Sequence, residues 1–129
     1  MSNSIEFSSP DTVIAPYGAY SHSAVVSASA RLLFTSGQVG ENHDGVAATV
    51  EEQYKVALTN IVNILAAHGA TPANIVKLTT YLVEPIAPAQ MRAIREAVLG
   101  DIKPAATMLP LPKLAAPEYL VEIEAVAAF

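Results

Sequence analysis

The chain has 129 residues, the length of one ordinary domain, so residues 1–129 are expected to fold as a single domain with one core. Hydrophobic residues make up 52% and charged residues 15%, which excludes an intrinsically disordered chain. So few charges leave little to cover a monomer's surface, and we expect an oligomer. The net charge of −5 disfavours a nucleic-acid partner, because binding phosphates requires clustered cations.

Cysteine is absent, which excludes disulfides, thiolate metal ligands and a cysteine nucleophile and agrees with a reducing compartment. Residues 1–11 lack the basic and apolar stretches of a secretory signal. The longest uncharged stretch, residues 12–30, is interrupted by Pro16, Gly18 and several serines, so it does not predict a membrane span. We therefore expect a cytoplasmic protein with no membrane partner.

The first third of the chain predicts short strands. Residues 5–7 favour a first strand, and residues 23–29 and 32–36 favour two more around a small turn at 29–31. Three glycines between positions 37 and 45 then predict a loop.

Residues 50–68 carry the pattern of an amphipathic helix. Thr49 and Glu52 form a capping-box pair at its start, and Gly69 marks its end. The apolar positions recur at spacings of three and four residues and are expected to be buried: Val50, Tyr54, Leu58, Ile61 and Leu65.

The second half alternates strands and a helix. Residues 75–83 predict a strand, residues 87–99 a second helix, and residues 105–109 and 120–127 two final strands. One face of the strand at 75–83 is expected to hold Val76, Leu78, Thr80 and Leu82. This order predicts an α+β sandwich in which two helices pack on one face of a mixed sheet.

Two carboxylates in the final strand are the first candidates for chemistry. Glu122 and Glu124 stand two residues apart, so both project from the same face, together with Leu120 and Val126. Carboxylates between apolar neighbours on an inner strand are unfavourable unless they are paired or functional. The same pattern also fits the solvent-facing side of an edge strand, and the sequence leaves both interpretations open.

Other segments give weaker indications. Backbone N–H groups around Ser36 and Gly37 could receive an oxyanion, although the residue pattern by itself favours a plain exit from a strand. The three histidines, His22, His43 and His68, lie in separate elements without ligand spacing, so no metal site is expected. No phosphate-binding glycine loop or hydrolase nucleophile motif occurs.

Several segments, in order and over nearly the whole chain, resemble the RidA (YjgF) family: GAYSHSA at 18–24, LFTSGQ at 33–38, IVKLT at 75–79, Met91, KPA at 103–105 and VEIEAVA at 121–127. The resemblance implies a chorismate-mutase-like βββαβαββ fold and a homotrimer with a ligand cleft at each subunit interface. It also implies hydrolysis of reactive enamines and imines, such as 2-aminoacrylate, to a 2-oxo acid and ammonia, with no metal or organic cofactor.

Site residues follow from the resemblance position by position. Glu122 matches the acidic residue that positions the attacking water, and Gly37 matches the glycine whose backbone receives the substrate. Tyr20 matches an aromatic residue of the cleft, and Ser36 lies beside Gly37 in the same wall. The substrate-binding wall is further expected to include Ala106 and Thr107.

Ala106 departs from the family pattern. The deaminases of the family carry an arginine there, which binds the substrate carboxylate through two parallel hydrogen bonds. Such charged hydrogen bonds contribute roughly 1.5–3 kcal/mol, so alanine predicts weak 2-aminoacrylate hydrolysis and a substrate that depends less on carboxylate recognition. The nearest cations in sequence are Arg31, Lys103 and Lys113.

Two other functions remain open from the sequence. One is a non-catalytic protein that binds or senses a small ligand in the same cleft, which Ala106 favours. The other is the endoribonuclease activity attributed to some relatives, which the net charge of −5 and the scattered cations disfavour.

Overall fold

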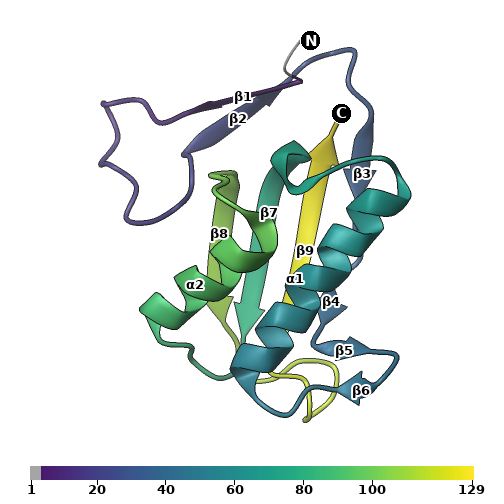
Figure 1. Ribbon diagram of the computed structural model, residues 1–129. Coiled ribbons are helices and arrows are strands. Elements are labelled where there is room, and N and C mark those ends of the chain that lie inside the picture. Colours follow the sequence, from purple (N-terminus) through teal and green to yellow (C-terminus); the bar gives the residue numbers. More distant parts are fainter. Residues whose placement is uncertain (1–3) are drawn as a thin grey trace.

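The structure, a computed structural model, describes residues 4–129 and consists of a mixed sheet with two helices on one face and a hairpin beside it (Figure 1). The elements are β1 (Ile5–Ser8), β2 (Ser23–Val26), β3 (Leu32–Phe34), β4 (Gln38–Val39), β5 (Glu41–Asn42), β6 (Gly45–Val46), α1 (Val50–Ala67), a 3-10 turn (Pro72–Asn74), β7 (Ile75–Leu82), α2 (Pro88–Leu99), β8 (Ala105–Pro110) and β9 (Val121–Ala128). The main sheet has the order β3-β9-β7-β8, and β4 extends β3 along β9. Only β7 and β8 are parallel among these pairs, which confirms the predicted α+β class with a mixed sheet.

Helix α1 forms as its sequence predicts. The Thr49 side chain accepts a hydrogen bond from the Glu52 N–H at 3.1 Å, and the Glu52 carboxylate accepts one from the Ala48 N–H at 3.3 Å. The first bond satisfies a donor that the first helical turn leaves free and is the Thr49 half of the predicted capping box, whereas the Glu52 carboxylate binds the N–H one residue before the cap and not that of Thr49. His68 caps the other end, and Gly69 follows with a φ of 75°. All five predicted apolar positions are at most 5% exposed.

The core lies between α1 and the sheet. Alternate residues of β9 face the helices and are at most 3% exposed: Val121, Ile123, Ala125 and Ala127. In β7 the buried face holds Leu78, Thr80 and Leu82 as predicted, but Ile75 takes the fourth buried position instead of Val76. A bulge between Ile75 and Lys77 is the reason, because one extra residue reverses the alternation of side chains.

Helix α2 covers the same face of the sheet beside α1 (Figure 1). Pro88 occupies its first turn, where a missing N–H has no consequence, and Gly100 ends it with a φ of 78°. Its apolar side packs on the core through Met91, Ile94 and Val98. The predictions for this helix and for the last two strands are confirmed.

The first third of the chain differs from the prediction. The strand expected at 23–29 ends at Val26, because the Ala30 N–H donates to the Ser27 carbonyl at 3.1 Å and closes a turn there. The strand expected at 32–36 ends at Phe34, since the Thr35 hydroxyl replaces a backbone carbonyl as acceptor for the Ala125 N–H. The loop expected at 37–45 contains β4 and half of a small β5–β6 hairpin.

The hairpin β1–β2 forms its own two-stranded sheet and projects from the body of the molecule (Figure 1). An isolated bridge between Ser21 and Ala105 ties the segment before β2 to the edge strand β8. None of the helices within residues 4–129 has the length and apolar character needed to cross a membrane.

Candidate functional site

Glu122 and Gly37 are in direct contact. Glu122 lies in β9 opposite Val39 of β4, and Gly37 immediately precedes β4. A Cβ atom on residue 37 would lie 2.7 Å from the Glu122 Cδ and would overlap the carboxylate. Only glycine therefore lets this carboxylate rest against the backbone, where Gly37 and Ser36 are exposed.

The other carboxylate of β9 shares this face. Glu122 pairs with Tyr81 and Glu124 with Thr79, which confirms the prediction that both acidic side chains project to the same side. Because β9 lies inside the sheet, the edge-strand alternative is wrong, although this face carries no helix. Glu124 accepts a hydrogen bond from the Tyr81 hydroxyl at 3.1 Å, and this bond raises the pKa of Tyr81.

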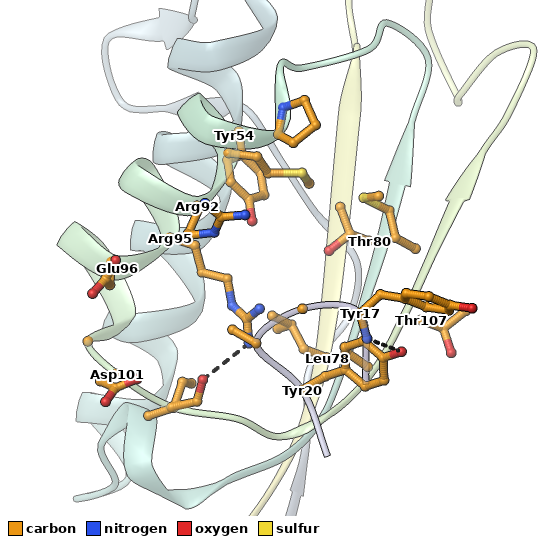
Figure 2. Close-up of a pocket in the computed structure, with 18 residues that line it drawn as sticks. Tyr17, Tyr20, Tyr54, Leu78, Thr80, Arg92, Arg95, Glu96, Asp101 and Thr107 are labelled. Atoms are coloured by element: carbon orange, nitrogen blue, oxygen red, sulfur yellow. Dashed lines mark hydrogen bonds between the residues drawn. The ribbon is translucent and has the colours of Figure 1, made fainter. Parts of the chain in front are cut away.

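A cavity of about 770 Å³ lies on the helix side of the sheet, between α2, the edge strand β8 and the loop around Tyr17. Figure 2 shows arginines of α2 on one wall and Tyr17, Tyr20, Thr80 and Thr107 opposite. Three predicted site residues line it: Tyr20, Ala106 and Thr107. Ala106 pairs with the buried Leu78, so its side chain faces the helices and the cavity.

Tyr20 is held in place by its own loop. Its hydroxyl accepts a hydrogen bond from the Tyr17 N–H at 3.2 Å, drawn in Figure 2, and its ring meets the His22 ring edge-on at 5.9 Å. His22 in turn hydrogen-bonds the Ile14 carbonyl through Nε2 at 2.6 Å. His22 thus supports the loop, and it is absent from the cavity lining.

The sequence interpretation missed two arginines. Arg92 and Arg95 of α2 both line the cavity that Ala106 lines, whereas Arg31, Lys103 and Lys113 do not. Arg92 and Arg95 stand three residues apart, so a helix places them on one side, and that spacing was the available signal. Their relation to Ala106 depends on how α2 packs over β8, which no local pattern specifies.

Arg95 lies in an unusual environment for a cation. Its guanidinium donates a hydrogen bond to the Ile102 carbonyl at 3.5 Å, and burial lowers its pKa while the nearby Tyr54 opposes that shift. Burial also raises the pKa of Tyr54 to about 12. The groups that shift the pKa of Arg95 include no carboxylate.

The predicted site residues form two sets in one chain. Gly37, Ser36 and Glu122 lie on the uncovered face of the sheet, and Tyr20, Ala106 and Thr107 lie around the edge strand β8. Strand β7 separates β9 from β8, and Ala106 faces the helices while Glu122 faces away from them. A single chain therefore does not assemble the one cleft that the resemblance predicts. Among residues 4–129 no group of three or more His, Cys, Asp or Glu could hold a metal ion.

Comparison with known proteins identifies the family. The family model described as Endoribonuclease L-PSP matches residues 11–129. A RutC family protein of Pyrococcus abyssi is 31% identical over 115 residues, which cover 87% of each chain. A crystal structure from Yersinia pestis, of a protein of unknown function in the conserved Rid family, is 30% identical with a TM-score of 0.82, covering 98% of this chain and 100% of that one.

The chain belongs to the Rid (YjgF) family. A member of the YjgF/YER057c/UK114 family from Mycobacterium tuberculosis superposes with a TM-score of 0.65 at 25% identity, covering 98% of this chain and 100% of that one. The Rid fold therefore extends over nearly all of the chain, including the segments that hold Gly37, Ala106 and Glu122.

Proposed function

We propose that this Rid protein hydrolyses a small enamine or imine to a carbonyl compound and ammonia, with Glu122 positioning the attacking water. The contact between the Glu122 carboxylate and the Gly37 backbone supports this proposal more than any other observation. It places a proton acceptor beside an exposed stretch of backbone that a substrate can reach.

The chemistry requires little beyond a carboxylate. An enamine becomes an imine when a proton moves from its nitrogen to its carbon, and the imine carbon is then electrophilic. Water adds to that carbon while Glu122 accepts one proton of the water and returns it to the imine nitrogen, which forms a carbinolamine. Glu122 then accepts the hydroxyl proton of the carbinolamine and passes it to the amino nitrogen, so that the C–N bond breaks, ammonia leaves and the C=O bond of the product forms. Water and imine are converted to ketone and ammonia, and Glu122 regains its initial state.

A second copy of the chain is part of the proposal. Glu122 and Gly37 lie apart from Tyr20, Ala106 and Thr107 in one chain, so a complete cleft requires that one copy's sheet face meet another's β8 edge. Exposed apolar side chains on that face and edge support such contact: Leu32, Phe34, Met108 and Leu109. The homotrimer that the family resemblance implies would meet this requirement.

The test is ammonia release from imines generated in solution by an amino-acid oxidase. Wild type is expected to accelerate release, and Glu122→Gln to lower kcat/KM by about 100-fold or more, the usual contribution of a positioned general base. Glu124→Gln is the matched control, because it removes a carboxylate from the same face two residues away. Unchanged turnover in Glu122→Gln would contradict the role of this carboxylate.

A second function is favoured by Ala106. Binding of a small ligand without turnover would also use the cavity, and alanine at this position removes the arginine of the family's deaminases. Tight binding of a 2-oxo acid by wild type in calorimetry, with no acceleration of any imine, would support this alternative. The family model's name suggests RNA cleavage, and salt-sensitive RNA retention by the purified protein would be the corresponding sign.

A further inference from the structure

Two arginines of helix α2 suggest how this chain recognises its substrate. They line the cavity whose strand wall, at Ala106, lacks a cation. We infer that Arg95, with Arg92 beside it, binds a carboxylate of the ligand in the space next to Ala106, so that the anion site is carried by the helix instead of the strand. This inference concerns the ligand class of the proposed function and rests on its cleft.

The position of Arg95 is the first argument. Figure 2 shows the Arg95 side chain extending from α2 into the space between the helix and the loop of Tyr17 and Tyr20. Its guanidinium is half-buried, and the hydrogen bond that it makes to the Ile102 carbonyl is long, at 3.5 Å. A guanidinium carries five N–H donors, so this bond leaves most of its donor capacity available for a ligand.

The charge balance is the second argument. Removing a cation from water is unfavourable unless an anion compensates it, and burial is the largest influence on the pKa of Arg95. The opposing influence comes from the phenol of Tyr54, which is itself 2% exposed and neutral at ordinary pH. Glu96 and Asp101 also line the cavity, but neither is among the groups that shift the pKa of Arg95, so its guanidinium remains open to a ligand carboxylate bound through two parallel hydrogen bonds.

The shape and polarity of the walls are the third argument. Ala106 leaves room opposite the helix, where an arginine would extend into the same space. Hydroxyl groups of Tyr54 and Thr80 lie on opposite sides of the cavity (Figure 2). The apolar side chains of Met91 from α2 and Met108 from β8 also line it. The cavity thus fits a small carboxylic acid with an apolar remainder, bound with its charged end toward α2.

The experiment compares pyruvate with its uncharged amide, pyruvamide, by calorimetry or ligand-observed NMR. Wild type is expected to bind pyruvate about 10-fold or more tightly than pyruvamide, as a charge-assisted pair implies. In Arg95→Gln this preference is expected to fall to nearly one, and in Arg92→Gln to fall partly. Lys55→Gln, which removes an exposed cation of α1 outside the cavity, should keep the full preference.

Moving the cation back to the strand makes the test specific. Arg95→Gln combined with Ala106→Arg is expected to regain the preference for pyruvate, which a variant that is merely misfolded would not do. An unchanged preference in Arg95→Gln overturns the inference, as does the absence of any preference in wild type or of binding by either ligand. Failure of the double variant to regain the preference also counts against it.

The two proposals fail in different ways. If the preference for pyruvate depends on Arg95 but no imine is hydrolysed, the anion site stands and the deaminase proposal fails. If imines are hydrolysed and Arg95→Gln leaves the KM of a carboxylate-bearing imine unchanged, the deaminase stands and the anion site fails.

Discussion

The two faces of the main sheet differ in how they are covered, because both helices of residues 4–129 pack on one face and neither packs on the other. The face under α1 and α2 is complete within one chain, and its core residues Leu58, Ile61 and Ile123 are fully buried. The opposite face carries Glu122, Glu124 and a row of polar side chains, and Phe34 at one side of it remains 71% exposed.

This difference predicts that stability and the proposed function depend on opposite faces of the sheet. The covered face obtains its stability from apolar contacts that the chain supplies by itself. The uncovered face places a carboxylate beside a glycine and leaves both accessible. Substitutions on the first face should therefore act on unfolding, and those on the second on assembly and turnover.

The largest effect on stability is expected from Leu58→Ala. Leu58 of α1 is fully buried in the core, and removing a buried leucine side chain lowers the free energy of unfolding by about 2–5 kcal/mol. Urea denaturation measures this loss. Thr59→Ala, at the exposed neighbouring position, serves as the control and should change stability by no more than about 0.5 kcal/mol. A similar change in both variants would contradict the proposed division between faces.

The raised pKa of Tyr54 predicts how the stability of the protein changes at alkaline pH. Burial raises its pKa from 10.0 to about 12, so the folded state holds the phenolic proton more tightly than the unfolded chain does. Its stabilisation is complete below pH 10 and is lost as the pH rises toward 12, by about 2–3 kcal/mol in total. Tyr54→Phe removes this titration, and unfolding curves at several alkaline pH values should show a shallower decline. If the stability of wild type and of Tyr54→Phe declined in parallel with rising pH, this contribution of Tyr54 would be contradicted.

Substitutions of Gly40 and Gly37 by alanine test this difference between the two faces. A Cβ at residue 40 would lie 2.5 Å from the Gln53 Cα, so Gly40→Ala must move backbone and should lower stability by about 1–3 kcal/mol. At Gly37 the obstructing atoms belong to the end of the Glu122 side chain. Gly37→Ala should therefore change stability by less than about 1 kcal/mol while displacing the carboxylate and lowering turnover by about 100-fold. Thermal unfolding measures the loss of stability in both variants, and ammonia release measures the loss of turnover. Equal loss of stability in the two would refute this contrast.

Phe34 should affect the stability of a single chain least. The side chain is 71% exposed, so Phe34→Ser is expected to change the unfolding free energy of dilute, dissociated protein by no more than about 0.5 kcal/mol. Because the proposed assembly covers this face, the same substitution should shift sedimentation toward smaller species. Val46→Ser, on the β5–β6 hairpin, is the control and should sediment as wild type does. Unchanged sedimentation of Phe34→Ser would contradict the proposal that this face forms part of the interface between copies of the chain.

Local patterns were sufficient for the helices and for the face of the last strand. The spacing of Tyr54, Leu58 and Ile61 follows the helical period, and the caps at Thr49 and Gly69 lie within a few residues of the groups that they satisfy. The common side of Glu122 and Glu124 follows from the two-residue period of a strand. The bulge at Ile75–Lys77 escaped prediction because it interrupts that period without a proline or glycine to mark it.

The buried polar residue of α1 shows where local patterns stop. Gln53 is 1% exposed, and its amide donates to the Ala47 and Glu118 carbonyls and accepts from the Leu120 N–H. These bonds join the start of α1 to a loop more than sixty residues later. Nothing near Gln53 in sequence distinguishes it from an exposed helical glutamine.

The sequence by itself determined both helices, the strands of the second half and most of their buried faces, and the family resemblance predicted Glu122 and Gly37 as site residues. Tertiary structure alone decided that Gly37 touches the Glu122 carboxylate, that Ala106 and Arg95 line the same cavity, and that one chain keeps Ala106 apart from Glu122. The reason is physical. Periodicity and capping depend on neighbours within a few residues, whereas these contacts depend on which strands pair and how a helix packs over them.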